Sequence, residues 1–415
     1  MAVKECIILA GGLGTRLRTV VADLPKCMAP VEGQPFLKYV IRLLLSRGLE
    51  RFIFSLCYKH ELIEKFLEDE FPYLNYQVSL EEEPLGTGGA IQRACKRTID
   101  TDLIVVNGDT LYKFDLNAAY AIHKENKADC TMLLKPMNNF DRYGAVELNE
   151  DGTIKDFKEK HFFNRGDINA GVYVLNVENF LAKDLPKTFS FEKDYLEKFY
   201  PSKKIFGIIG DAYFIDIGIP EDFQRAQEEL KQLPLRPENI DEAWTLFLDR
   251  DGVINYEKED DYILNWDEFE FYPDVLQAMP VFAKKFSTIV VISNQRGVGK
   301  GLMTEDDLLT IQKKMRDQIE QAGGRVDKIY YCTAVDPKHF YRKPNPGMAL
   351  QAAKDFPQID FSKTIMVGNK LSDMQFGRNA GTYTVYLKTT HPNQSRLHPD
   401  IDLSFNSLLD FAKAL

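Results

Sequence analysis

Short apolar runs alternate with amphipathic stretches along this chain, and the alternation occurs in two series. The first series begins with the strand-like ECIILA, continues with a helical face formed by Leu37, Val40, Ile41 and Leu44, and returns to the strand-like RFIFSLC. The second series begins at TLFLDRDG and repeats apolar runs at 287–294, 328–332, 363–369 and 382–387. Because strands that alternate with helices form βαβ units, we expect an α/β fold class with parallel strands in both series.

The two series predict two domains. A chain of 415 residues exceeds what one hydrophobic core usually serves. Residues 233–244 are polar, contain two prolines and show no periodicity, which favours a linker between a domain at 1–232 and another at 245–415. The region 129–176 is rich in β-type sequence, so we expect the first sheet to be mixed.

Composition limits the class of partner. Hydrophobic residues make up 44% and charged residues 27% of the chain, as in globular proteins, and the formal net charge is −10. A net negative chain is not expected to bind nucleic acid or an anionic membrane. The six cysteines form no CxxC pair, and the N-terminal apolar run is too short for a signal peptide or a membrane span, so we expect a cytoplasmic protein. A homo-oligomer is left open.

A glycine-rich turn follows the first strand pattern. Gly11, Gly12 and Gly14 let backbone N–H groups approach phosphate oxygens, while Arg16 and Lys26 supply cations for a triphosphate and a second phosphate. By itself the turn also fits a generic tight turn or a dinucleotide fingerprint, although the third glycine of that fingerprint is absent.

Longer motifs carry a resemblance to a known family. LAGGLGTRL with LPKCMAPV, followed by EEPLGTGGA at 82–90 and NGDT at 107–110, resembles the sugar-1-phosphate nucleotidyltransferases over residues 3–230. That resemblance implies a Rossmann-like domain whose catalytic cations are Arg16 and Lys26. It also implies nucleotide-binding residues, namely Gly11, Gly12, Gly14, Thr15, Gly86, Thr87 and Gly88.

Two aspartates of the first domain are candidate magnesium ligands. Asp109 follows the apolar strand DLIVVN, at the sheet edge where α/β proteins bind ligands, and Asp216 lies in FIDIG. In the family pattern both hold Mg²⁺, which with the two cations would neutralise the oxygens of a sugar phosphate and a nucleoside triphosphate. The same resemblance implies contacts to the sugar phosphate from Gly144, Glu159, Lys160 and Asn169.

A pair of aspartates opens the second domain. LFLDRDGVIN places Asp249 and Asp251 two residues apart at a strand end, so that one carboxylate can attack phosphorus while the other transfers protons. On this motif alone, an acidic loop that binds calcium is the alternative.

The remaining motifs of this domain resemble the haloacid dehalogenase superfamily, nearest to histidinol-phosphate and heptose-bisphosphate phosphatases. ISNQRGVGKG, YRKPNPGM and MVGNKLSDM supply its later motifs, which implies a second Rossmann-like domain with little or no cap. Asp249, Asp251, Ser293 and Lys343 would be catalytic, and Asp249, Asp251, Asn369 and Asp373 would hold Mg²⁺. Asn369 replaces the usual aspartate and brings no charge. Only Cys332 and His339 precede the RKP motif, so a zinc site is not expected.

Taken together, the two resemblances imply consecutive reactions on one sugar. The first domain is most similar to enzymes that use GTP and D-glycero-α-D-manno-heptose 1-phosphate, and the second to phosphatases of the corresponding 1,7-bisphosphate. The expected partners are sugar phosphates and a nucleoside triphosphate. The alternatives are a mannose or other hexose 1-phosphate nucleotidyltransferase, and a second domain that senses sugar phosphates without catalysis.

Overall fold

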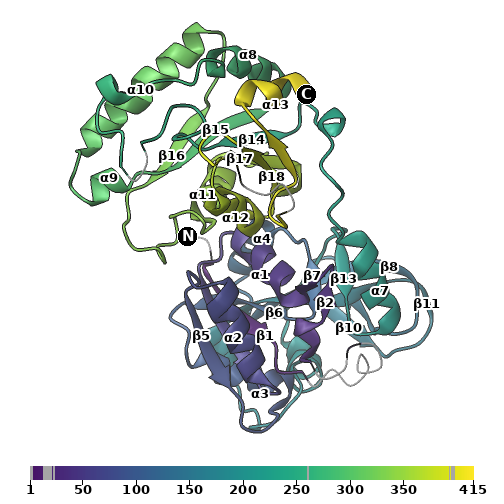
Figure 1. Cartoon of the computed structure of the whole chain (residues 1–415). Coiled ribbons are helices and arrows are strands. Elements are labelled where there is room, and N and C mark those ends of the chain that lie inside the picture. Colours follow the sequence, from purple (N-terminus) through teal and green to yellow (C-terminus); the bar gives the residue numbers. More distant parts are fainter. Residues whose placement is uncertain (1–2, 13–20, 22–23, 259–260, 392, 394–397) are drawn as a thin grey trace. The chain divides into compact units, whose positions relative to one another are not determined.

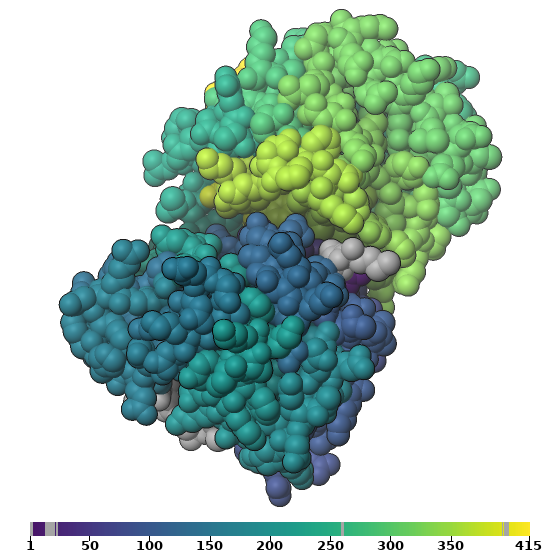
Figure 2. Space-filling view, turned by 180° about the vertical axis from the view of Figure 1, so that it is seen from behind, coloured from purple at the N-terminus to yellow at the C-terminus, as the bar shows by residue number. Residues whose placement is uncertain are grey.

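The computed structural model describes residues 3–12, 21, 24–258, 261–391, 393 and 398–415. The chain divides into two compact units, Met1–Lys231 and Gln232–Leu415. In the space-filling view the first unit is coloured from purple to teal, and the second continues from green-teal to yellow (Figure 2).

The first unit is built on a mixed nine-stranded sheet with the order β10-β9-β11-β6-β1-β4-β5, in which β8 pairs with β11 and β12. The strands β1, β4, β5 and β6 are parallel, whereas β11 runs antiparallel to β6 and β8. Their bounds are β1 Glu5–Leu9, β4 Arg51–Leu56, β5 Tyr76–Leu80, β6 Asp102–Asn107, β8 Cys130–Phe140, β9 Ala145–Leu148, β10 Ile154–Lys158, β11 Phe163–Asn176 and β12 Ile205–Ile209.

Two small ladders complete the strands of the first unit. The strands β7 (Thr110–Tyr112) and β13 (Phe214–Asp216) form an antiparallel pair, as do β2 (Pro30–Val31) and β3 (Gln34–Pro35). The helices are α1 Phe36–Ser46, α2 His60–Glu70, α3 Gly86–Cys95, α4 Leu116–Glu125, α5 Val177–Leu181, α6 Glu197–Phe199 and α7 Pro220–Glu229, with a π-helix at Phe191–Leu196.

Side-chain alternation divides the core of the first unit between the faces of its sheet. On one face, Ile7, Ile53 and Val105 pack against α3, α5 and the π-helix. The helix α1 buries Leu37, Val40, Ile41 and Leu44, which confirms the apolar face predicted from the sequence. No helix among the described residues is both long and apolar enough to cross a membrane.

The second unit is a parallel six-stranded sheet covered on both faces. Its order is β16-β15-β14-β17-β18-β19, with bounds β14 Thr245–Leu248, β15 Thr288–Asn294, β16 Lys328–Cys332, β17 Thr364–Gly368, β18 Tyr383–Leu387 and β19 Leu403–Phe405. The helices are α8 Val275–Lys285, α9 Arg296–Gly299, α10 Glu305–Gln321, α11 Gly347–Asp355, α12 Leu371–Ala380 and α13 Leu408–Ala414. This is the predicted Rossmann-like arrangement.

Successive residues of the second sheet enter different cores. Leu246 and Leu248 pack with α8, α10 and α13, while Phe247 between them packs with α11 and α12 on the opposite face (Figure 1). The described part of the connection from β14 to α8 carries one short 3₁₀ turn, Trp266–Glu268, and no cap domain.

The segment expected to be a linker packs into the second unit. Leu235, Ile240 and Trp244 are buried in the core that contains α8 and α10. The carbonyl of Trp244 accepts hydrogen bonds from the backbone N–H and the hydroxyl of Ser287, at 2.9 and 3.0 Å. These contacts make the region part of the second unit, even though its prolines and polar residues lack periodicity.

Candidate active sites

The first candidate site lies where β1 and β6 end side by side. The backbone N–H of Gly108 donates to the carbonyl of Leu9 at 2.8 Å, so the turn after β6 lies beside the turn after β1. At Gly11 a Cβ would come 3.1 Å from Cβ of Cys57, tighter than most real contacts, which favours glycine here. Gly12 has open space around its Cα. Gly14, Thr15 and Arg16 lie outside the described residues.

Lys26, Asp109 and Asp216 converge at this edge. The antiparallel pairing of β7 with β13 places Thr110 opposite Asp216, and the N–H of Ile217 donates to the carbonyl of Asp109 at 3.1 Å. The ammonium of Lys26 forms an ion pair with Asp109 and lies 3.3 Å from Oδ1 of Asp216. Residues distant in the sequence are therefore brought into one charged cluster.

The electrostatics of this cluster favour a bound cation. Burial and the neighbouring charge of Asp109 raise the pKa of Asp216, although Lys26 opposes the shift. Burial alone would lower the pKa of Lys26, but the two carboxylates outweigh it and raise that pKa. A divalent cation would relieve the repulsion between the two carboxylates, so Asp109 and Asp216 fit Mg²⁺ as ligands.

The predicted sugar-phosphate residues occupy different places. The hydroxyl of Tyr143 donates to Asp216 at 3.3 Å, and the adjacent Gly144 lies so close to the carbonyl of Lys158 that a Cβ would come within 2.6 Å of that oxygen. Glu159 and Lys160 are exposed after the end of β10. Tyr143 and Gly144 therefore adjoin the charged cluster, whereas Glu159 and Lys160 point to solvent.

Asn169 belongs to a polar network that the sequence did not reveal. Its amide nitrogen donates to Oε1 of Glu192 at 2.8 Å and to the hydroxyl of Tyr173 at 2.7 Å, and its oxygen accepts the N–H of Gly171 at 3.0 Å. Glu192 lies on the π-helix Phe191–Leu196. No motif marked Glu192, because its partner is 23 residues away on another element.

The predicted nucleotide-binding residues Gly86, Thr87 and Gly88 lie in the first turn of α3 and not in a loop, and the protein itself anchors this turn. Gly86 has a φ of +71°, and a Cβ at Gly88 would overlap the ring of Phe189. The hydroxyl of Thr87 accepts the backbone N–H of Phe191 at 2.9 Å. The buried carboxylate of Glu81 accepts hydrogen bonds from Ser55 and from the N–H of Leu85, both at 3.0 Å. Packing thus requires the glycines here, in addition to any contact with a nucleotide.

The second candidate site lies at the carboxyl ends of β14 and β17. The N–H of Asp249 donates to the carbonyl of Val367 at 3.0 Å, so the residues after both strands are neighbours. Lys343 places its ammonium 2.8 Å from Oδ1 of Asp249 and 2.7 Å from Oδ1 of Asp373, and all three side chains are buried. Burial and the charge of Asp373 raise the pKa of Asp249 to about 7, against the opposing effect of Lys343.

Asp251 is held in a different environment. Its carboxylate accepts hydrogen bonds from Arg250 at 2.8 Å, Asn255 at 2.9 Å and Gln295 at 3.0 Å. Burial would raise the pKa of Asp251, but the guanidinium and these hydrogen bonds lower it. Gln295 also donates to the hydroxyl of Ser293 at 2.7 Å, which connects Ser293 to the aspartate pair.

Asn369 has an unsatisfied oxygen at the same edge. The side chain is fully buried, and its amide nitrogen donates to Glu257 and Thr390, at 2.9 and 2.8 Å. Its Oδ1 is buried and has no hydrogen-bond partner among the described residues. An amide oxygen without a partner beside Asp249 and Asp373 is suited to a cation, so this set fits Mg²⁺.

The proposed metal ligands are few in both units. Among the described residues, no group of three or more His, Cys, Asp or Glu side chains is arranged to hold a metal ion. Mg²⁺ usually takes one or two protein carboxylates and completes its shell with water and phosphate oxygens, which is the kind of site that both units offer.

Three side chains of the second site were missed by sequence reasoning. Gln295 follows Ser293 and Asn294 directly, so its position beside a motif was the available signal. Arg250 lies between the two aspartates and is 1% exposed, whereas a sequence alone suggests an exposed arginine. Glu257 lies in a polar connection and has no motif around it.

Comparison with known proteins assigns a family to each unit. Residues 5–232 match the family model described as nucleotidyl transferase, and residues 242–411 match that described as polynucleotide kinase 3 phosphatase. The crystal structure of HddC from Yersinia pseudotuberculosis is 38% identical, with a TM-score of 0.51, and the match covers 55% of this chain and 100% of that one.

Individual relatives agree with this division. The D-glycero-alpha-D-manno-heptose 1-phosphate guanylyltransferase of Aneurinibacillus thermoaerophilus is 48% identical over 227 residues, which are 55% of this chain and 98% of the relative. The D-glycero-alpha-D-manno-heptose-1,7-bisphosphate 7-phosphatase of Mycobacterium bovis is 33% identical over 183 residues, which are 43% of this chain and 94% of the relative. The chain therefore belongs to the nucleotidyl transferase family and carries, after that domain, a phosphatase domain of the haloacid dehalogenase type.

Proposed function

We propose that this chain is a bifunctional enzyme that makes GDP-heptose. Its second unit removes the 7-phosphate of D-glycero-D-manno-heptose 1,7-bisphosphate, and its first unit transfers GMP from GTP to the resulting heptose 1-phosphate. One observation carries the proposal: the second unit resembles a 7-phosphatase and the first unit resembles a guanylyltransferase. The product of such a phosphatase is the substrate of such a guanylyltransferase.

In the phosphatase unit, Asp249 is the nucleophile. One of its oxygens attacks the phosphorus, the bond from phosphorus to the C7 oxygen breaks, and Asp251 protonates the leaving oxygen. Asp251 then takes a proton from water, which attacks the aspartyl phosphate and releases inorganic phosphate. The lowered pKa of Asp251 favours the ionised form that this second half requires, whereas the first half requires its protonated form. Lys343 favours the ionised form of Asp249, and the hydroxyl of Ser293 is available to a phosphoryl oxygen.

In the transferase unit, no protein nucleophile is needed. An oxygen of the sugar phosphate attacks the α-phosphorus of GTP, the bond from the α-phosphorus to the bridging oxygen breaks, and pyrophosphate leaves. Lys26 reduces the repulsion between these anions, together with Arg16. Gly11, Gly12, Gly86 and Gly88 allow the nucleotide to approach the backbone, and Asn169 with Gly144 contributes to the sugar-phosphate side.

Mg²⁺ is the cofactor proposed for both units. It would be held by Asp109 and Asp216 in the first unit, and by Asp249, Asp251, Asn369 and Asp373 in the second. When bound it supplies positive charge next to the phosphate oxygens. All six cysteines are free thiols, which supports a reducing compartment such as the cytoplasm.

Phosphate release separates this proposal from its alternatives. The wild type should release phosphate from heptose 1,7-bisphosphate in the presence of Mg²⁺, and Asp249→Asn should not. A wild type that releases no phosphate from a panel of sugar phosphates, yet retains nucleotidyl transfer, would instead favour a sensor domain. Greater transfer to mannose 1-phosphate than to heptose 1-phosphate would favour the hexose alternative.

A further inference from the structure

Glu257 contacts the predicted metal site from a distant part of the sequence. It lies in the connection between β14 and α8, and 9% of its side chain is exposed. Its Oε1 accepts a hydrogen bond from the amide of Asn369 at 2.9 Å, and its Oε2 accepts one from Nζ of Lys370 at 2.6 Å. One buried carboxylate therefore binds both residues that follow β17.

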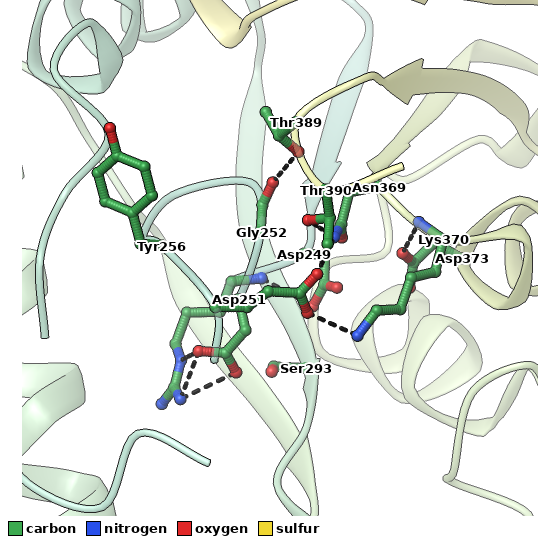
Figure 3. Close-up of polar contacts among 12 residues, drawn as sticks. Asp249, Asp251, Gly252, Tyr256, Ser293, Asn369, Lys370, Asp373, Thr389 and Thr390 are labelled. Carbon is green, nitrogen blue, oxygen red and sulfur yellow. Dashed lines mark hydrogen bonds and ion pairs between the residues drawn. The ribbon is translucent and has the colours of Figure 1, made fainter. Parts of the chain in front are cut away.

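This contact fixes which way the Asn369 amide points. A carboxylate can only accept hydrogen bonds, so the nitrogen of Asn369 must face Glu257. The hydroxyl of Thr390 takes the second N–H at 2.8 Å (Figure 3). Both donors are thereby used, and the oxygen is the atom left without a partner. The orientation follows from the chemistry of the neighbours.

The surrounding backbone fits closely around this arrangement. Gly252 has a φ of +85°, and a Cβ there would overlap the amide of Asn369. The hydroxyl of Thr389 donates to the carbonyl of Gly252 at 2.5 Å and holds that turn in place (Figure 3). The amide thus packs against the backbone of Gly252, and its two acceptors, Glu257 and Thr390, fix which way its oxygen faces.

The charges around Asn369 are paired. An asparagine ligand brings no negative charge, and Lys343 partly neutralises Asp249 and Asp373. Glu257 lies one hydrogen bond behind the neutral ligand, and the ammonium of Lys370 compensates its charge at 2.6 Å. Outer groups of this kind orient ligands and tune metal affinity.

We propose that Glu257 is a positioning residue of the phosphatase metal site: it holds the amide nitrogen of Asn369 and so directs Oδ1 of Asn369 toward Mg²⁺. The inference rests on the proposed Mg²⁺-dependent function of the second unit. It has a specific consequence. Asn369→Asp would put two carboxylates in contact, so an aspartate at 369 should serve the site only when position 257 is neutral.

Tryptophan fluorescence offers a readout that is independent of activity. Both tryptophans, Trp244 and Trp266, belong to the second unit, so their fluorescence follows the unfolding of that unit alone. A ligand that binds the folded state raises stability in proportion to the logarithm of its concentration over its Kd. Urea unfolding at a series of Mg²⁺ concentrations therefore yields the Mg²⁺ affinity of the second unit for each variant.

Four variants test the proposal in this assay. Glu257→Met should weaken Mg²⁺ binding by about 10-fold or more, the usual effect of losing an outer-sphere partner. Glu257→Gln keeps an acceptor but loses the charge, and should weaken binding less. Asn369→Asp alone should not tighten binding, whereas Glu257→Gln with Asn369→Asp should return it to within about 3-fold of the wild type, because the total charge is restored.

Glu268→Gln is the matched control, because Glu268 lies in the same connection but pairs with Lys258. Its Mg²⁺ affinity should equal that of the wild type. Unchanged affinity in Glu257→Met, or tighter binding in Asn369→Asp alone, would overturn the inference while the wild type still responds to Mg²⁺. A wild type without any Mg²⁺ response would overturn the proposed metal-dependent function, and the role of Glu257 with it. If Glu257→Met fails to fold, Glu257→Gln and the paired variant decide.

Discussion

The ammonium of Lys343 lies 2.8 Å from Oδ1 of Asp249, and only 3% and 9% of the two side chains are exposed. Burial and Asp373 raise the pKa of Asp249 to about 7 even with Lys343 beside it, so without that cation the carboxyl would be protonated at neutral pH. Lys343 opposes the shift and favours the ionised nucleophile. The same cation also compensates Asp373, so it supports both the chemistry and the folding of the second unit.

Replacement of Lys343 should therefore affect two measurements at once. Lys343→Met leaves two buried carboxylates without a cation, which should lower the stability of the second unit by about 3–5 kcal/mol and phosphate release by about 100-fold or more. Tryptophan-monitored urea unfolding and a phosphate assay test these effects, with Lys343→Arg as the control that keeps the charge. Pyrophosphate release by the first unit should not change. Normal phosphate release by Lys343→Met would contradict the role of this lysine.

A second prediction concerns the charged cluster of the first unit, which contains Lys26, Asp109 and Asp216. Lys26→Ala and Asp109→Ala should each abolish pyrophosphate release from GTP and heptose 1-phosphate, because the cation and the metal ligand that neutralise the phosphates are lost. Lys65→Ala, which removes an exposed ion pair with Asp69 on α2, should retain full activity. Near-normal turnover in either cluster variant would refute the assignment.

The environment of Asp102 allows a prediction of how the stability of the first unit changes at low pH. It is buried, and its carboxylate accepts hydrogen bonds from Lys124 at 2.9 Å and Asn176 at 2.8 Å. Burial would raise the pKa of Asp102, but the hydrogen bonds from His123, Lys124 and Asn176 lower it well below the usual value. Because the pKa is lower in the folded state, the stabilisation is complete above the unfolded pKa of about 4 and is lost as the pH falls through the folded pKa.

Asp102→Asn should accordingly lower the free energy of unfolding of the first unit by about 3 kcal/mol at pH 7, and by progressively less below about pH 4. Urea unfolding followed by far-UV circular dichroism measures this, since tryptophan fluorescence locates the transition of the second unit separately. The exposed Asp184, which lies between α5 and the π-helix, supplies the control as Asp184→Asn. A penalty that does not change between pH 7 and pH 3 would show that Asp102 stabilises the unit by packing and not by charge.

Trp244 tests whether the segment before β14 belongs to the second unit. It is 7% exposed, and its ring centroid lies 5.5 Å from that of Tyr383. Trp244→Ala should destabilise the second unit by about 3–5 kcal/mol through the lost burial and the cavity. Trp266 remains as the fluorescent probe. Leu233→Ala removes a side chain that is 70% exposed and should change stability by less than about 0.5 kcal/mol. Equal effects from the two changes would mean that the segment is a free linker.

Local pattern was sufficient for much of the fold. The apolar run predicted at 328–332 is the strand β16, and the run at 287–294 contains β15. Both could be recognised because parallel strands that are buried on both faces have continuous apolar sequences. Asp249, Lys343 and Asp373 could likewise be named from motifs: Asp249 directly follows β14, Lys343 lies in YRKPNPGM, and Asp373 lies in MVGNKLSDM, in the first turn of α12. They lie close together because β14 pairs with β17, and no local sequence pattern predicts that pairing.

The features that the sequence did not predict depend on contacts between residues that are distant in the sequence. Glu257 meets Asn369 across 112 residues, and nothing near Glu257 marks it as different from other charged residues of its connection. The burial of Arg250 depends on the position of Asp251, and that of Trp244 on the core beneath it. Glu159 and Lys160 were expected to contact a sugar phosphate, yet both are exposed, so their assignment stays a prediction.

The central claim is that one chain performs two successive reactions on a heptose. Mass spectrometry of the products formed from heptose 1,7-bisphosphate, Mg²⁺ and an equal mixture of nucleoside triphosphates tests it most directly. The account predicts GDP-heptose, inorganic phosphate and pyrophosphate from the wild type, and no dephosphorylated heptose from Asp249→Asn. Recovery of the bisphosphate unchanged from the wild type, or of a heptose linked chiefly to another base, would contradict it.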